Sequence, residues 1–251
     1  MEQGLRWIPY CGEAPTPEVW LSRWNLDPLL LVALGLAAFA LCDSRIWQGR
    51  AAQRRLLAAA WATTVLLYVS PLCALSSAFF TIRVVHHMAL VLVIAPLLAI
   101  GLAPWLKRVP APPWLCTAGA ALVFWLWHAP SPYAAALSSD AVYALMQLSL
   151  LASATLFWVA MRRSEPAVAL VAILATTVQM GLLGALITFA SQPLYAPHLA
   201  STLSWGISPL EDQQVAGVIM WAPGSIAYLA AAMLIGWRWL RAAPACGREP
   251  A

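Results

Sequence analysis

The sequence predicts an all-α, polytopic integral membrane protein: a bundle of seven transmembrane helices with an outer amino terminus and a cytoplasmic carboxyl terminus. Three observations predict it: a shortage of charge, seven apolar segments, and basic residues on alternate connections. The 251 residues are 62% hydrophobic and only 10% charged, whereas soluble domains average about 25% charged residues. Because so few charges cannot cover a water-exposed surface, the sequence excludes an ordinary soluble protein.

Seven segments of the chain are apolar over roughly the 20 residues that a helix needs to cross a bilayer. The expected spans are Pro28–Ile46, Leu56–Leu75, Phe79–Ala103, Trp114–His128, Val142–Met161, Ala167–Ala190 and Val215–Leu240. The fourth is the shortest. Prolines at positions 71, 96 and 223 lie within or near the ends of spans, where they predict kinks. Glycines at positions 181, 184 and 217 suit close helix packing in lipid.

Basic residues fall on alternate connections between these spans. Eleven of the fourteen Lys and Arg lie on one side: Arg45, Arg50, Arg54, Arg55, Lys107, Arg108, Arg162, Arg163, Arg238, Arg241 and Arg248. Since cytoplasmic loops carry the excess of Lys and Arg, this side is expected to face the cytoplasm. The sequence therefore predicts a single domain, with an outer tail over 1–27, the bundle over 28–240 and a cytoplasmic tail over 241–251. The net charge of +4 thus reflects topology in a lipid bilayer, and we expect no nucleic-acid partner.

Two further features concern the outer side. The first 25 residues lack an apolar h-region, so no signal peptide is expected and the first span should stay in the mature protein. Cys11 and Cys73 both fall on this side. They could pair or bind a soft metal, although scattered membrane cysteines are more often packing residues.

The outer side also collects the polar groups of the bundle. His86 and His87 lie near the start of the third span, and His128 ends the fourth. The acid–amide run Glu211-Asp212-Gln213-Gln214 precedes the seventh span, and His198 lies in the loop before it. Because ionisable groups are costly near hydrocarbon and often mark function there, these residues predict a functional site.

Imidazoles are good ligands for copper, iron and zinc, and thioethers for cuprous copper. Adjacent helical residues point about 100° apart, so His86 and His87 cannot both face one site from a regular helix. We therefore expect His87 and His128 as metal ligands. His86 would be either a third ligand or a residue that contacts the ligands without binding the metal. Methionines 88, 146 and 220 could supplement them, although packing is their commoner role.

The acidic residues have two possible roles. Acids at a helix amino terminus commonly cap it, so one of Glu211 and Asp212 should do so while the other faces inward, to balance Arg83 or bind a cation. An unpaired guanidinium costs about 2.5–3.5 kcal/mol at the middle of a membrane helix. The sequence therefore predicts that Arg83 faces the bundle interior and contacts Asp212 or Glu211. Gln213 could orient a ligand.

At these residues the chain resembles the CtaG family of cytochrome c oxidase assembly factors. The shared segments are Trp24–Pro28, His87-Met88 followed by Ala95–Gly101, Trp127–Pro130, Gly184–Phe189, and Asp212–Gln214 with Met220-Trp221. The resemblance implies a seven-span assembly factor in the bacterial plasma membrane, with cytochrome c oxidase subunits as partners and copper as the metal. It also marks departures: Arg83, Tyr143 and Gln147 stand where many members have histidine.

The leading hypothesis is a non-enzymatic oxidase assembly factor that assists copper delivery or subunit maturation at the outer face. The sequence has no nucleophile–His–acid order, phosphate loop or zincin motif. One alternative is a membrane electron carrier with a single haem near the outer face, since the inner halves of the spans contain no histidine. Another is a copper or small-solute transporter, for which the inner halves offer few polar groups beyond Thr176, Thr177 and Gln179.

Overall fold

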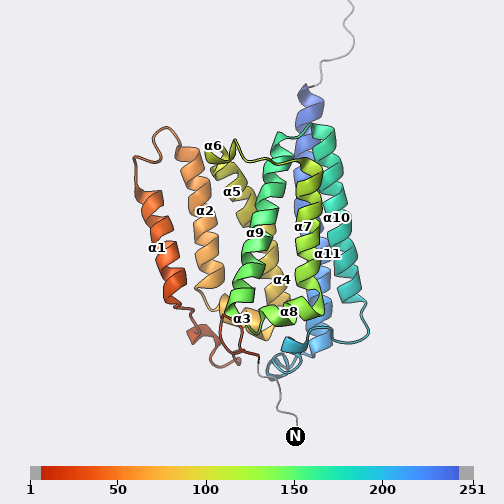
Figure 1. Ribbon diagram of the computed structural model, residues 1–251. Coiled ribbons are helices and arrows are strands. Elements are labelled where there is room, and N and C mark those ends of the chain that lie inside the picture. The colour runs from red at the N-terminus through yellow and green to blue at the C-terminus, as the bar shows by residue number, and fades with distance from the viewer. Residues whose placement is uncertain (1–6, 243–251) are drawn as a thin grey trace, which may run out of the picture.

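The computed structural model describes residues 7–242, and all regular structure among them is helical (Figure 1). The α-helices are α1 Pro28–Cys42, α2 Ala51–Tyr68, α3 Leu72–Ala78, α4 Phe80–Ala89, α5 Ala95–Gly101, α6 Ala103–Leu106, α7 Pro113–His128, α8 Pro130–Ala136, α9 Asp140–Arg163, α10 Pro166–Thr188 and α11 Pro209–Ala242. Short 3-10 turns are η1 Trp20–Ser22, η3 Ala196–His198 and η4 Leu203–Trp205. Most of the expected cytoplasmic tail, 243–251, lies outside the described residues.

Each of the seven expected spans coincides with helix, but not all are long enough to cross a bilayer. Four helical stretches are long and apolar enough: Phe80–Gly101, α9, α10 and α11. A fifth results if α2 and α3, bent by 50° where Pro71 interrupts them, count as one span. Helices α1 and α7, of 15 and 16 residues, reach only about 22–24 Å at 1.5 Å per residue, short of a core of about 30 Å. By length and composition the described residues therefore contain four or five spans, rather than seven.

The third expected span contains an irregular turn. Between α4 and α5 the chain forms a π-helical segment, η2, over Leu90–Ile94, and Pro96 follows in the first turn of α5. Single-turn π segments within α-helices are rare and are frequent at functional sites. This one lies in the middle of the bundle, where α2, α9 and α11 contact it.

Helices α10 and α11 pack closely because two glycines meet between them. A Cβ on Gly184 would lie 2.8 Å from the carbonyl oxygen of Gly217, and one on Gly217 would lie 2.6 Å from the carbonyl oxygen of Gly184. Small residues allow such backbone approach in lipid, where packing and hydrogen bonds drive helix association. The other side of α11 packs against α4, while α9 packs against α7 and α5.

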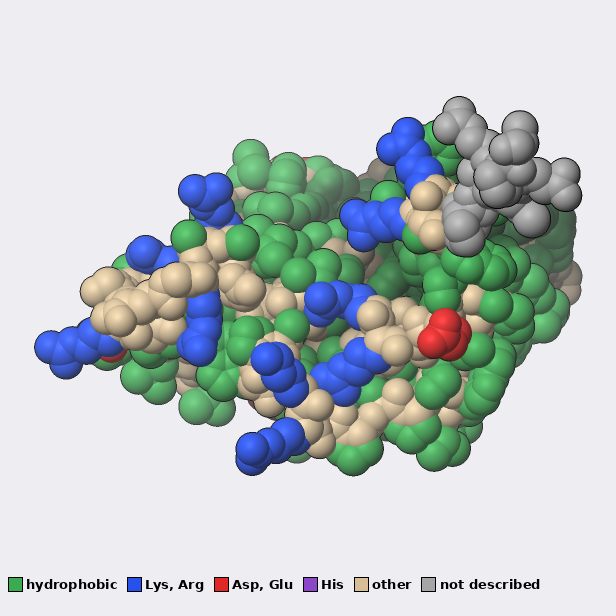
Figure 2. Space-filling model, turned by 90° about the horizontal axis from the view of Figure 1, so that it is seen from above, with side chains coloured by type: hydrophobic (Ala, Val, Ile, Leu, Met, Phe, Trp, Pro, Cys, Tyr) green, Lys and Arg blue, Asp and Glu red, His purple; other side chains and the backbone are tan. Residues whose placement is uncertain are grey.

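The two ends of the bundle differ in charge and covalent structure. Lys and Arg side chains spread over the end at the top of Figure 1, which we call the basic face (Figure 2). The opposite end, the N-terminal face, carries residues 7–27, α3, α8, η3 and η4 (Figure 1). There a disulfide joins Cys11 to Cys73, one of the two possibilities that the sequence left open for these cysteines. It holds the amino-terminal segment against α3.

A candidate metal site near the N-terminal face

His87 of α4 and His128 of α7 face each other inside the bundle. Their ring centroids lie 5.5 Å apart with the ring planes at 85°, and the side chains are only 2% and 3% exposed. The Nδ1 atom of His128 lies 2.7 Å from the carbonyl oxygen of Phe124, which fixes the ring and leaves Nε2 without a partner. Both ring nitrogens of His87 also have no hydrogen-bond partner. Buried polar atoms normally have partners, so free imidazole nitrogens on two facing helices suit a metal ion.

His86 points elsewhere. Its Nε2 lies 2.8 Å from the carbonyl oxygen of Leu67 in α2, and its Nδ1 lies 3.0 Å from that of Ile82. Both nitrogens therefore face backbone carbonyls, and the ring joins α4 to α2. The expectation that the two adjacent histidines diverge is confirmed, and His86 does not complete a ligand set in this arrangement.

His198 is also engaged. Its Nε2 lies 2.7 Å from the hydroxyl of Tyr133 in α8, and its Nδ1 lies 3.3 Å from the carbonyl oxygen of Ala78. Burial lowers the pKa of His198 from 6.5 to about 3, because a buried imidazolium loses its hydration. The residue is a neutral link between η3, α8 and α3.

The two acids at the start of α11 divide their roles. Glu211 is exposed and forms a capping box with Ser208: the Ser208 backbone N–H donates to Glu211 Oε2 at 2.9 Å, and the Glu211 N–H donates to Ser208 Oγ at 3.2 Å. This reciprocal pairing is a common helix start. Asp212 points inward, as expected for one of the pair, but it serves another helix. It accepts hydrogen bonds from the backbone N–H groups of Phe80 at 2.7 Å and Thr81 at 3.2 Å.

Asp212 is therefore the cap of α4, supplied from α11. The residue at the start of α4, Phe79, cannot cap the helix with its own side chain, so the carboxylate satisfies the free N–H groups and complements the helix dipole. Gln213 is also committed to backbone, since its Oε1 accepts from the Leu194 N–H and its Nε2 donates to the carbonyl oxygen of Ile187. It holds the loop after α10 and does not orient the histidines.

The expected ion pair of Arg83 with Asp212 or Glu211 does not form. Arg83 faces the interior as predicted, with none of its surface exposed, but its Nη1 donates to the Tyr143 hydroxyl at 2.8 Å. Its guanidinium carbon lies 5.1 Å from the centre of the same ring, while Nε and Nη2 have no hydrogen-bond partner. Asp212, the one buried carboxylate within residues 7–242, already binds the α4 backbone.

No group of three or more His, Cys, Asp or Glu side chains able to hold a metal occurs within residues 7–242. Of the residues expected in the site, the structure brings together only His87 and His128. The arrangement is thus two buried imidazoles that face each other.

Of the comparisons with known proteins, one gives a match. The family model for the cytochrome c oxidase caa3 assembly factor (Caa3_CtaG) matches residues 33–242. The chain belongs to this family. No curated protein and no solved structure matches it significantly.

In this caa3 assembly factor family member, the three positions marked as departures take part in two hydrogen bonds, which meet α9 one turn apart. Arg83 bonds to Tyr143, and Gln147, one turn further along α9, accepts a hydrogen bond of 3.0 Å from the Tyr68 hydroxyl. Tyr10 of the amino-terminal segment stacks on Tyr143 with ring centroids 5.2 Å apart. No motif in the sequence marks Tyr10, Tyr68 or Tyr143 as partners of these positions.

Proposed function

We propose that this family member assists the copper-dependent maturation of cytochrome c oxidase at the outer face of the bacterial plasma membrane. His87 and His128 would hold copper as cargo, and the N-terminal face would contact the immature oxidase subunit. The proposed role is non-enzymatic. One observation carries it: two buried, facing imidazoles with three unpartnered nitrogens between them, a donor type that suits copper.

The outward orientation of the N-terminal face has two independent supports. Basic residues gather on the opposite end (Figure 2), as the cytoplasmic side of a membrane protein requires. The Cys11–Cys73 disulfide suits the oxidising side of the plasma membrane. Reporter fusions test it: Arg50, Arg108 and Arg163 should lie in the cytoplasm, and Ser138 and Ala200 outside. One inverted fusion would contradict the proposed orientation of the bundle.

Copper retention tests the site. The parent, purified in detergent with a reductant present after growth with copper, should retain the metal. The His87→Ala/His128→Ala protein should lose it while eluting as the same folded species. His198→Gln is the matched control, because His198 is equally buried but its nitrogens already contact Tyr133 and Ala78. Equal copper in parent and double variant, or none in the parent, would refute the metal site.

Deletion of the gene tests the role in the cell. Oxidase activity and oxidase copper content should both fall, and added copper should restore part of each. A deletion strain with normal oxidase would contradict the proposed maturation function. The double histidine variant should behave like the deletion, whereas His198→Gln should complement it.

A further inference from the structure

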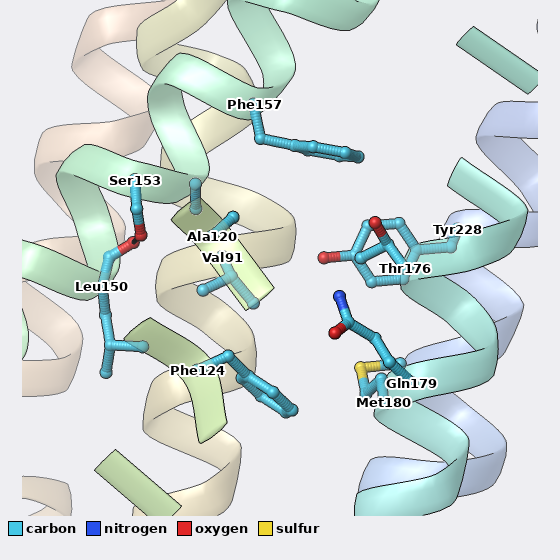
Figure 3. Close-up of a pocket in the computed structure, with 11 residues that line it drawn as sticks. Val91, Ala120, Phe124, Leu150, Ser153, Phe157, Thr176, Gln179, Met180 and Tyr228 are labelled. Carbon is cyan, nitrogen blue, oxygen red and sulfur yellow. Dashed lines mark hydrogen bonds between the residues drawn. The ribbon is translucent and has the colours of Figure 1, made fainter. Parts of the chain in front are cut away.

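A small cavity lies in the middle of the bundle between η2, α7, α9, α10 and α11 (Figure 3). Tyr228, Thr176 and Gln179 line one side, and Val91, Leu150 and Ser153 line the other. Its volume is about 30 Å³. A bound water needs roughly 10–15 Å³ measured in this way, so the cavity has room for about two water molecules.

Two polar groups facing this cavity have no partner in the described part of the protein. The Tyr228 hydroxyl and the Gln179 amide make no hydrogen bond to residues 7–242. Thr176 and Ser153 donate to the carbonyl oxygens of Ala172 and Leu150, which leaves their oxygens free to accept. Polar groups without partners in hydrocarbon cost several kcal/mol each, so a hydrogen-bonding ligand in the cavity would stabilise these two side chains.

The cavity wall has a specific construction. The Trp158 indole N–H donates to the carbonyl oxygen of Val91 at 2.8 Å, within the π-helical segment whose widened turn places Val91 at the cavity. The same indole stacks on the Tyr228 ring, with centroids 5.7 Å apart and planes at 13°. Trp158 thus fixes both the π segment and the tyrosine whose hydroxyl faces the cavity.

We propose that this cavity is a hydration site within the bundle, holding about two ordered water molecules bound to Tyr228 and Gln179. The ligand is neutral, because no Asp, Glu, Lys, Arg or His lines the cavity and an unpaired ion would meet a large desolvation cost. It both donates and accepts, because Thr176 and Ser153 offer acceptors while the Gln179 amide and Tyr228 hydroxyl offer donors. An acyl chain end could fill the space but would leave these groups unpaired.

The hydration site lies next to the histidine pair. Val91 follows His87 by one helical turn in α4–η2, and Phe124 precedes His128 by one turn in α7. The Phe124 ring lines the cavity and packs against the His128 ring at 4.5 Å between centroids. Phe157 lies at the opposite end (Figure 3). The proposed hydration site therefore has a phenylalanine at each end, and one of the two contacts an imidazole of the histidine pair.

Hydroxyl-radical labelling by X-ray radiolysis tests the proposal without any metal. Radicals form from the water itself, so side chains touching bound water are oxidised even when bulk solvent cannot reach them. In protein reconstituted in nanodiscs, Met180, which lines the cavity and is 3% exposed, should be oxidised. Met146, with no exposed surface and no place in the cavity lining, should not.

Variants show whether the polar groups hold the water. Gln179→Leu/Tyr228→Phe should abolish Met180 labelling, while Thr177→Val, which removes a neighbouring hydroxyl bonded to Ile173, should leave it unchanged. No labelling of Met180 in the parent, or labelling that persists in the double variant, would overturn the proposal. The parent comparison of Met180 with Met146 is decisive even if the double variant does not fold.

Discussion

Asp212→Ala should destabilise the protein strongly, because Asp212 connects two helices. Its carboxylate is 4% exposed and accepts from two backbone N–H groups at the start of α4. Removing it leaves one buried and one partly buried N–H donor without partners, at about 1–3 kcal/mol for a buried one. It also removes a helix cap, worth about 0.5–2 kcal/mol. Since these contributions overlap, we expect a loss of about 2–4 kcal/mol in the free energy of unfolding.

Glu211→Ala is the matched control. Glu211 caps its own helix from an exposed position, so its loss should cost only about 0.5–1 kcal/mol. Asp212→Asn should fall between the two, because the amide keeps one acceptor oxygen. Unfolding of the detergent-solubilised proteins can be followed by tryptophan fluorescence. A Glu211→Ala protein as unstable as Asp212→Ala would refute the assignment of Asp212 as the cap of α4.

Two other predictions concern packing and pH. Gly184→Ala should lower the free energy of unfolding by about 1–3 kcal/mol, because it forces a methyl group against Gly217. Gly35→Ala is the control: nothing lies within 4 Å of the added Cβ, so this change should stabilise α1 slightly. A similar loss of stability in both variants would contradict the close contact between α10 and α11. The pKa of His198 is about 3 in the folded protein against 6.5 ordinarily, so between these pH values the unfolded chain binds a proton that the folded protein does not. The contribution of neutral His198 to the free energy of unfolding is therefore complete above pH 6.5. It declines as the pH falls towards 3, by up to about 1.4 kcal/mol per pH unit. Unfolding measured across this range should show a weaker pH dependence in His198→Gln, and an unchanged slope would refute the assignment.

The sequence predicted helix positions well because the signal was long-range and redundant. Each apolar segment is long enough to predict a helix without knowledge of the segments that pack against it, and every expected span is helical. The number of crossings was harder, because it depends on where helices end. The 15 residues of α1 and the 50° bend at Pro71 follow from turn geometry and packing, which hydropathy averages out.

The site was predictable only in part. Facing histidines on sequence-adjacent spans could be anticipated, and His87 and His128 do meet. The partner of Asp212 could not be anticipated, because it is the backbone of another helix. Nearly every residue type has a backbone N–H group, so the sequence does not identify which one is free. Arg83 was assigned to a carboxylate because charge pairing is the simplest expectation. The structure places a tyrosine hydroxyl and ring there instead.

These assignments bear on the oxidation state of the copper that the proposed site would hold. Asp212 binds the α4 backbone and Glu211 is exposed, so neither neutralises a cation at the imidazole pair. Arg83 lies on the same face of α4 one turn from His87 and makes no carboxylate contact, which adds positive charge in a setting where charge is poorly screened. A divalent ion meets about twice the repulsion of a monovalent one, so the purified protein should retain cuprous copper in the presence of a reductant. It should lose the metal on oxidation and bind zinc poorly. Copper that stays bound and gives a Cu(II) paramagnetic resonance signal after oxidation would refute this charge argument while leaving the histidine pair as ligands.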